Sequence, residues 1–197
     1  GSLSPLFSIA ERVASRALHP PPLDASLLPT TLQPATLAAL TTGAIFLKSA
    51  PSGPSPFFFW VGYAPCHNAT SAPTAASARS DGRLSSLCLF WRAPTHPGGA
   101  APQPASMSVR LASISAVVGG AEGWRGEKLH AAPDGTLAEC GWVIGVQAAP
   151  SLLLVAKDTA ARDSWVRTLS HLAREVATEA ASETAVGAAV GATGAPP

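Results

Sequence analysis

Short apolar runs separated by turn residues occupy the middle of the chain. Residues 43–48 (GAIFLK) form a short apolar run that begins with a glycine, and residues 57–63 (FFFWVGY) follow a turn rich in Pro, Ser and Gly. Aromatic and β-branched residues favour strands, so these two runs are predicted to pair as a hairpin. In residues 84–91 the alternation places three large side chains on one face: Leu87, Leu89 and Trp91.

Four further runs extend this β pattern. Residues 108–118 are predicted as one long strand that ends at a Gly-Gly pair, and a short strand is predicted around 128–130. Residues 140–146 and 152–156 form two more apolar runs. Together these runs predict seven short strands. Pro and Gly also interrupt the chain too often for a helical bundle.

The hydrophobic period changes after residue 157. Asp158 or Thr159 is predicted to cap a helix. Apolar residues then recur at steps of three and four, which indicates one stripe along an amphipathic helix. The residues of this stripe are Ala161, Trp165, Leu169, Leu172 and Val176. Beyond residue 178 few large apolar side chains remain, and we expect a disordered tail.

A second amphipathic helix is predicted near the start of the chain, over residues 3–18. Leu6, Ile9 and Val13 follow helical spacing, and Pro5 suits the first helical position. Residues 19–36 are Pro-rich with scattered leucines, and we interpret them as an extended strap. The chain begins with Gly-Ser and without Met, so we expect it to be part of a longer protein.

Composition excludes several functional classes. The formal net charge is +1, from 13 basic and 12 acidic residues, which is not the basic footprint of a nucleic-acid binder. The three cysteines lack a CxxC spacing, so we expect no disulfide framework, no metal site and a reducing, cytoplasmic location. No catalytic or cofactor motif occurs. The sequence therefore predicts a non-enzyme without a cofactor.

Several segments, in this order, resemble the pleckstrin-homology (PH) family, and most closely the domain at the start of phosphoinositide-specific phospholipase C. Residues 43–48 resemble the first strand of the family, and the helix with Trp165 resembles its closing helix. Three more segments are similar to family patterns between these two elements: residues 87–91, residues 114–120 with the following Glu127-Lys128-Leu129, and residues 151–156.

The resemblance implies a mainly β fold, a seven-stranded PH-like barrel or sandwich capped by a C-terminal α-helix. It covers residues 41–177. Residues 1–40 would then form an N-terminal helical extension with its strap, and 178–197 the tail.

The resemblance also implies a place for phosphoinositide binding, a basic cluster at the open end of the barrel. Lys48 occupies the family's lysine position, and Arg83 and Arg92 are the nearby candidates for headgroup contacts. The second strand of the family normally adds Arg or Lys, but residues 57–63 contain neither. The alternative interpretation, which we favour, is that these residues are ordinary surface cations on a fold that has lost lipid binding.

The aromatic run around residue 58 has more apolar surface than one strand face buries. One hypothesis is a docking surface for a protein partner, formed by Phe58 and Trp60 together with Leu6 and Ile9 of the N-terminal helix. The other, which we favour, is that the N-terminal helix packs over the aromatic run in cis.

Three functions remain open from the sequence. The first is a protein-docking or scaffolding module of a larger intracellular signalling or cytoskeletal protein. The second is a module that binds phosphoinositides or an anionic membrane. The third is the non-catalytic N-terminal part of a phospholipase C-like enzyme. A cytoplasmic location, at a membrane or the cytoskeleton, fits all three, and the oligomeric state stays open.

Overall fold

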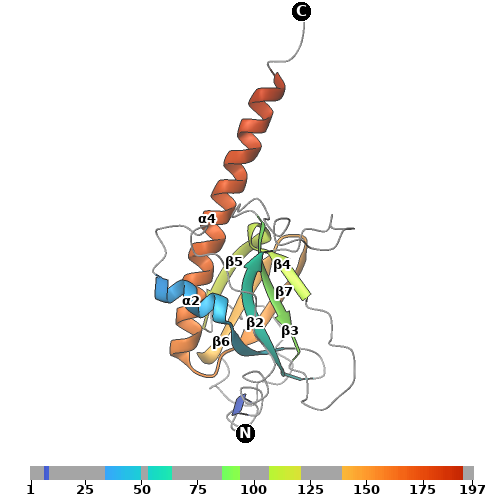
Figure 1. The fold of residues 1–197 in the computed structure, drawn as a ribbon. Helices are drawn as coiled ribbons and strands as arrows, with labels where there is room; N and C mark the ends of the chain where they lie inside the picture. Colours follow the sequence, from blue (N-terminus) through green and yellow to red (C-terminus); the bar gives the residue numbers. More distant parts are fainter. Residues whose placement is uncertain are drawn as a thin grey trace, which may run out of the picture.

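The computed structural model describes residues 7–8, 34–49, 53–63, 86–93, 107–120 and 139–192. Seven antiparallel strands in these ranges form one sheet, in the spatial order β4-β3-β2-β1-β7-β6-β5 (Figure 1). Their bounds are β1 Ala44–Lys48, β2 Ser55–Tyr63, β3 Leu87–Arg92, β4 Met107–Arg110, β5 Ile114–Gly119, β6 Gly141–Val146 and β7 Ala149–Val155. With the C-terminal helix α4 (Thr159–Ala192), this is the mainly β, PH-like fold that the sequence predicted.

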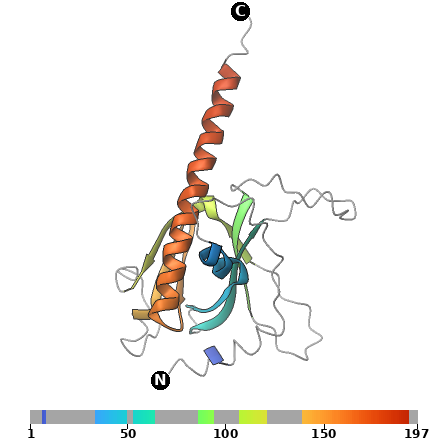
Figure 2. The same cartoon turned by 60° about the vertical axis from the view of Figure 1, so that its left-hand side comes forward.

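The sheet bends at β1 into two halves. β1 pairs with β2 along its whole length, from Ala44 opposite Phe59 to Lys48 opposite Ser55. Its register with β7 covers only Leu47 and Lys48. Because the second pairing is so short, the halves β4-β3-β2-β1 and β7-β6-β5 diverge and leave an opening between them. Helices α4 and α2 (Pro34–Thr42) lie across this opening (Figures 1 and 2).

The core lies between the two halves and beneath α4. Phe46 of β1 is at its centre, and its ring meets three others edge to face: Phe59 at 5.7 Å and Trp142 and Trp165 at 5.0 Å between centroids. Aromatic pairs in this geometry add stabilisation beyond the area that they bury. Trp165 of α4 is therefore the apolar plug that the sequence predicted, and the rest of the predicted stripe from Leu169 to Val176 is buried with it.

Helix α4 begins as expected and ends later than expected. Asp158 Oδ1 accepts a hydrogen bond from the Ala161 N–H at 2.7 Å, which satisfies one of the open donors in the first turn. The helix then continues to Ala192 and projects beyond the barrel (Figure 2). Residues 178–192, where the sequence analysis expected the disordered tail, therefore continue the helix, and their many Ala residues favour it.

Two other expectations are corrected. The predicted extended strap ends in helix α2, whose Leu40 is buried in the main core. The predicted strand 108–118 is two strands, because the short helix η3 (Leu111–Ser113) interrupts it and carries the chain from one sheet edge to the other. The split restores the count of seven, while the strand predicted around 128–130 lies outside the described residues.

Candidate functional site

Lys48 is the last residue of β1 and lies on the inner face of the sheet, the face of Phe46. Its Nζ lies 5.5 Å from the ring centroid of Phe57 and 5.6 Å from that of Trp91. An ammonium group at this distance from an aromatic face is attracted by the ring quadrupole. The indole Nε1 of Trp91 is buried and has no hydrogen-bond partner among the residues that the structure describes. Lys48 therefore lies over the face of an indole ring whose own donor is unsatisfied within the described residues.

Arg92 points to the opposite face. The preceding residue, Trp91, belongs to the main core, and side chains alternate along a strand. The guanidinium of Arg92 lies 5.6 Å from the ring centroid of Trp60 on the outer face, and partial burial lowers its pKa. Because the sheet separates Lys48 from Arg92, the two do not form one headgroup pocket. Arg83 lies outside the described residues.

The aromatic residues of the outer face form a stacked ladder. Phe58 stacks on Trp60 at 5.7 Å and Trp60 on Phe90 at 5.4 Å between ring centroids. Phe58 is only 7% exposed and Trp60 only 8%. In this structure the two residues are therefore not an open docking patch.

The N-terminal segment contributes Phe7 to the neighbouring part of the outer face. Phe7 is 5% exposed and shares an apolar cluster with Leu47 of β1, Val143 of β6, Val155 of β7 and Cys140. Phe7, which the sequence analysis did not single out, therefore packs in cis on a part of the sheet next to the aromatic run, and packing of the N-terminal helix over the run itself stays a prediction. Leu6 and Ile9 lie outside the described residues.

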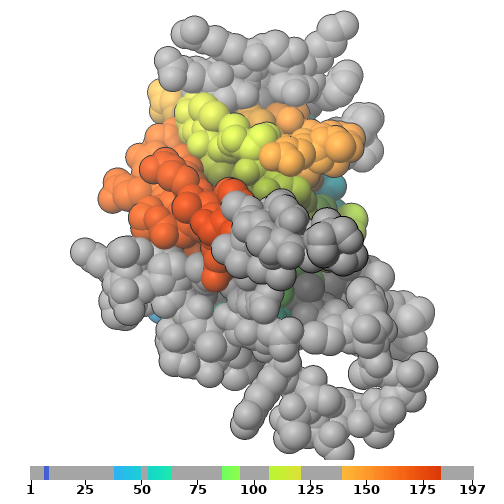
Figure 3. Space-filling model, turned by 90° about the horizontal axis from the view of Figure 1, so that it is seen from above, coloured from blue at the N-terminus to red at the C-terminus, as the bar shows by residue number. Residues whose placement is uncertain are grey.

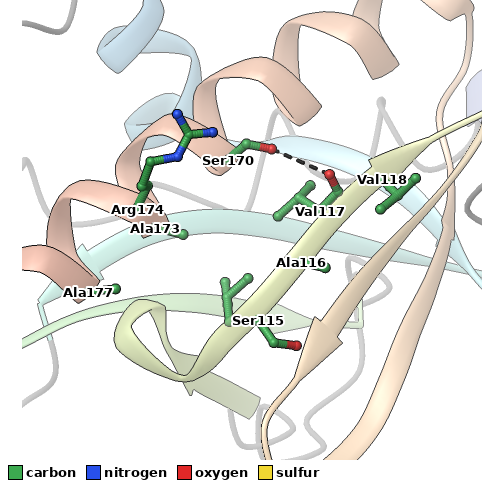
Figure 4. A pocket seen from close by; sticks show the side chains of 9 residues that line it. Ser115, Ala116, Val117, Val118, Ser170, Ala173, Arg174 and Ala177 are labelled. Atoms are coloured by element: carbon green, nitrogen blue, oxygen red, sulfur yellow. Dashed lines mark hydrogen bonds between the residues drawn. The ribbon is translucent and has the colours of Figure 1, made fainter.

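The open surface lies elsewhere, between β5 and α4. A cavity of about 390 Å³ is lined on one side by β5 residues from Ile114 to Val118. On the other side it is lined by Ser170, Ala173, Arg174 and Ala177 of α4 (Figure 4). We call this cavity the β5–α4 groove. In the view of Figure 3, β5 in yellow-green lies directly beside α4 in orange-red.

Strand β5 is an edge of the sheet, so one side of its backbone has no strand partner. The Gly120 N–H donates to the Gly141 carbonyl at 2.8 Å, which shows that residue 120 faces β6. Along a strand, the backbone N–H and C=O groups of successive residues point to opposite sides of the strand. The backbone groups of Val117, three residues from Gly120, therefore point away from β6 and toward the groove. Within the described ranges, the hydrogen bond that its carbonyl accepts is a long one, 3.4 Å, from the Ser170 hydroxyl.

The walls of the groove consist mostly of small side chains, and one larger apolar side chain is exposed. Val118, at its end, is 38% exposed, one of two large apolar side chains that stand out in the described part of the chain. The sequence analysis missed this site because its residues are mostly small. The available signal was the Gly-Gly pair at 119–120, which marks the end of the strand but does not show that the strand is an edge.

Metal chemistry has no evident place in the described ranges, which contain no group of three His, Cys, Asp or Glu side chains suited to a metal ion. Nor does any helix within them combine the length and apolar character needed to cross a bilayer. Cys88 and Cys140 are unpaired and buried, and burial raises the pKa of both thiols. A raised thiol pKa lowers reactivity, so neither has the character of a nucleophile.

No protein-family model matches this chain, and no curated protein matches it. Among solved structures it is similar to the PH domain from TgAPH, at 14% identity and a TM-score of 0.40, over 73% of this chain and 89% of that one. It is also similar to the Inner Membrane Complex (IMC) Sub-compartment Protein 1 (ISP1) from Toxoplasma gondii, at 11% identity and a TM-score of 0.44, over 74% and 97%. The phospholipase C subtype is not confirmed by either structure. The strand order and the closing helix give the chain a PH-like fold.

Proposed function

We propose that this chain is a non-catalytic docking module of a larger cytoplasmic protein, and that it binds an extended segment of a partner protein in the β5–α4 groove. The segment would add a strand to β5, so that its backbone pairs with the open side of Val117. The observation that carries the proposal is an edge strand beside a cavity of about 390 Å³.

The chemistry of the groove supports strand addition. Backbone groups of an edge strand can exchange solvent for the backbone of a partner, which provides affinity with little dependence on sequence. Small side chains on both walls, such as Ala116, Ala173 and Ala177, leave room for the incoming strand. The 3.4 Å bond from Ser170 is weak enough for a partner N–H to replace it.

Selection of short random peptides displayed on phage against the immobilised chain tests this proposal. We expect selected peptides to perturb the amide signals of β5 and of residues 170–177 in NMR spectra. Val117→Pro should abolish their binding, because proline removes the open N–H and is tolerated where that N–H is unpaired within the sheet. Val117→Ala is the matched control, because it removes the same side chain and keeps the N–H.

Two results would overturn the proposal. One is that no peptide is enriched over a library passed through an empty support. The other is that enriched peptides perturb only regions outside the groove. Equal loss of binding in Val117→Ala and Val117→Pro would show that the valine side chain, and not strand addition, is responsible.

A second candidate function is binding of an anionic headgroup at the open end of the barrel. The specific observation is the Lys48 ammonium over the ring of Trp91, whose buried Nε1 has no hydrogen-bond partner among the described residues. Multiply charged headgroups need several cations, and Arg92 lies on the other face. We therefore rank headgroup binding below peptide docking.

Vesicle co-sedimentation tests the second function. Neutral vesicles with and without a few per cent of a phosphorylated phosphoinositide should be compared at low and near-physiological salt. Binding that requires the phosphoinositide and is weakened by Lys48→Gln, but not by Arg92→Gln, would support the Lys48 site. Binding that neither variant changes would exclude that site.

A further inference from the structure

We infer that the segment bound in the β5–α4 groove is acidic, with two Asp or Glu residues that pair with Arg174 and Arg167 of α4. This inference rests on the proposed function and specifies its partner. It follows from the distribution of charge along the helix wall of the groove.

The charges on this side of α4 are basic and unpaired. Arg174 lines the cavity, and its side chain rises from the helix at the rim (Figure 4). Arg167 precedes it by seven residues, about two helical turns, so both lie on the same side of α4. In the described part of the chain, neither guanidinium forms an ion pair. Each is therefore available to a carboxylate of a partner.

The other charges of α4 do not cancel this pair. Arg162 is already neutralised, because its Nη2 lies 2.7 Å from Asp163 Oδ1. Glu175 and Glu179 do not line the groove. The rim along the groove therefore carries a local positive charge on a chain whose overall formal charge is only +1.

The separation of the two arginines favours carboxylates over a phosphate. Seven residues correspond to about 10 Å along a helix axis, so the cations are spread and do not form a cluster. A phosphate group is best held by several cations at one point, whereas separated guanidinium groups each suit one carboxylate. Side chains on one face of a strand recur every second residue, about 6.6 Å apart. Acidic residues two or four positions apart would match the arginines, given the reach of the arginine side chains.

The peptide selection described above also tests this inference. We expect the enriched peptides to contain Asp or Glu at two positions, two or four residues apart. Replacing both acids with their amides should weaken binding about tenfold, since an exposed ion pair contributes up to about 1 kcal/mol. Arg174→Gln and Arg167→Gln should each weaken the acidic peptide about threefold and leave the amide peptide unchanged. Arg174→Lys should retain part of the affinity.

Arg110→Gln is the matched control, because it removes an exposed arginine that does not line the groove. Peptides that perturb the groove but show no acidic preference would overturn this inference and leave the proposed function intact. A phosphoserine peptide that binds where its Glu counterpart does not would also overturn it. Absence of any peptide that binds the groove would overturn the proposed function as well.

Discussion

The outer face of β2 and β3 and the free edge of β5 differ in composition and in accessibility. The first carries Phe58, Trp60 and Phe90 in a stacked ladder, and the first two are almost completely buried. The second carries mostly Ser, Ala and Val and borders an open cavity. A large apolar residue in the sequence therefore does not by itself mark an interaction surface, because it can be buried in the folded chain. An unpaired strand edge can be an interaction surface even when its side chains are small.

The largest effect is expected for Trp60→Ala, on the aromatic side of this comparison. If Trp60 is part of the folded interior, truncation should lower the free energy of unfolding by about 3 kcal/mol, as for other buried aromatic residues. Urea denaturation followed by fluorescence or circular dichroism measures this change. Unchanged stability together with lost partner binding would show instead that Trp60 is an exposed docking residue.

Phe7→Ala tests the covering of the neighbouring part of the outer face. We expect a loss of about 2 kcal/mol, the transfer free energy of one buried aromatic side chain. Amide exchange should also become faster in β6 and β7, whose Val143 and Val155 belong to the same apolar cluster as Phe7. A stability equal to that of the unmodified chain would mean that the N-terminal segment does not pack in cis.

The two buried thiols give a pH-dependent test with a smaller effect. Burial raises the pKa of Cys88 and Cys140 in the folded state, so the unfolded chain loses these protons first as the pH rises. Their stabilising contribution is complete below the thiol pKa of the unfolded chain, about 8.5, and declines as the pH rises through the folded-state values. Urea denaturation between neutral and alkaline pH should show a shallower decline in a Cys88→Ala, Cys140→Ala variant. An identical pH slope in both proteins would contradict burial of the thiols.

The smallest effect is expected at the open edge. Val118→Ser should change the free energy of unfolding by less than about 0.5 kcal/mol, because the side chain is substantially exposed. The same variant should weaken any peptide selected for the groove. A loss of stability comparable to that of Trp60→Ala would show that the edge is covered in solution.

Local sequence patterns were sufficient to predict much of the fold. The alternation of Leu87, Leu89 and Trp91 matches the buried face of β3, and the stripe that contains Trp165 matches the buried face of α4. These features depend on spacing within one element, which the sequence contains directly. Helix α2 was missed because Pro34 and the leucines before it suggested an extended segment, although proline is well tolerated in a first helical turn.

The candidate sites required relations between elements. The alternation within β1 and within β3 shows which residues of each strand share a face. Only the pairing of both strands with β2 shows that Lys48 and Arg92 lie on opposite faces of the sheet. The break at η3 is similarly invisible in an uninterrupted β-prone run. It places β4 and β5 at opposite edges of the sheet and so creates the groove.

The sequence by itself determined the mainly β class, the closing helix with its tryptophan plug and a helix cap at Asp158 or Thr159, because each is set by residues close together in the chain. Only the tertiary structure decided that the aromatic run is buried, that Lys48 and Arg92 are separated, and that β5 is a free edge beside α4. These properties depend on which strands become neighbours. Long-range packing decides that, and the sequence pattern of a single strand does not encode it.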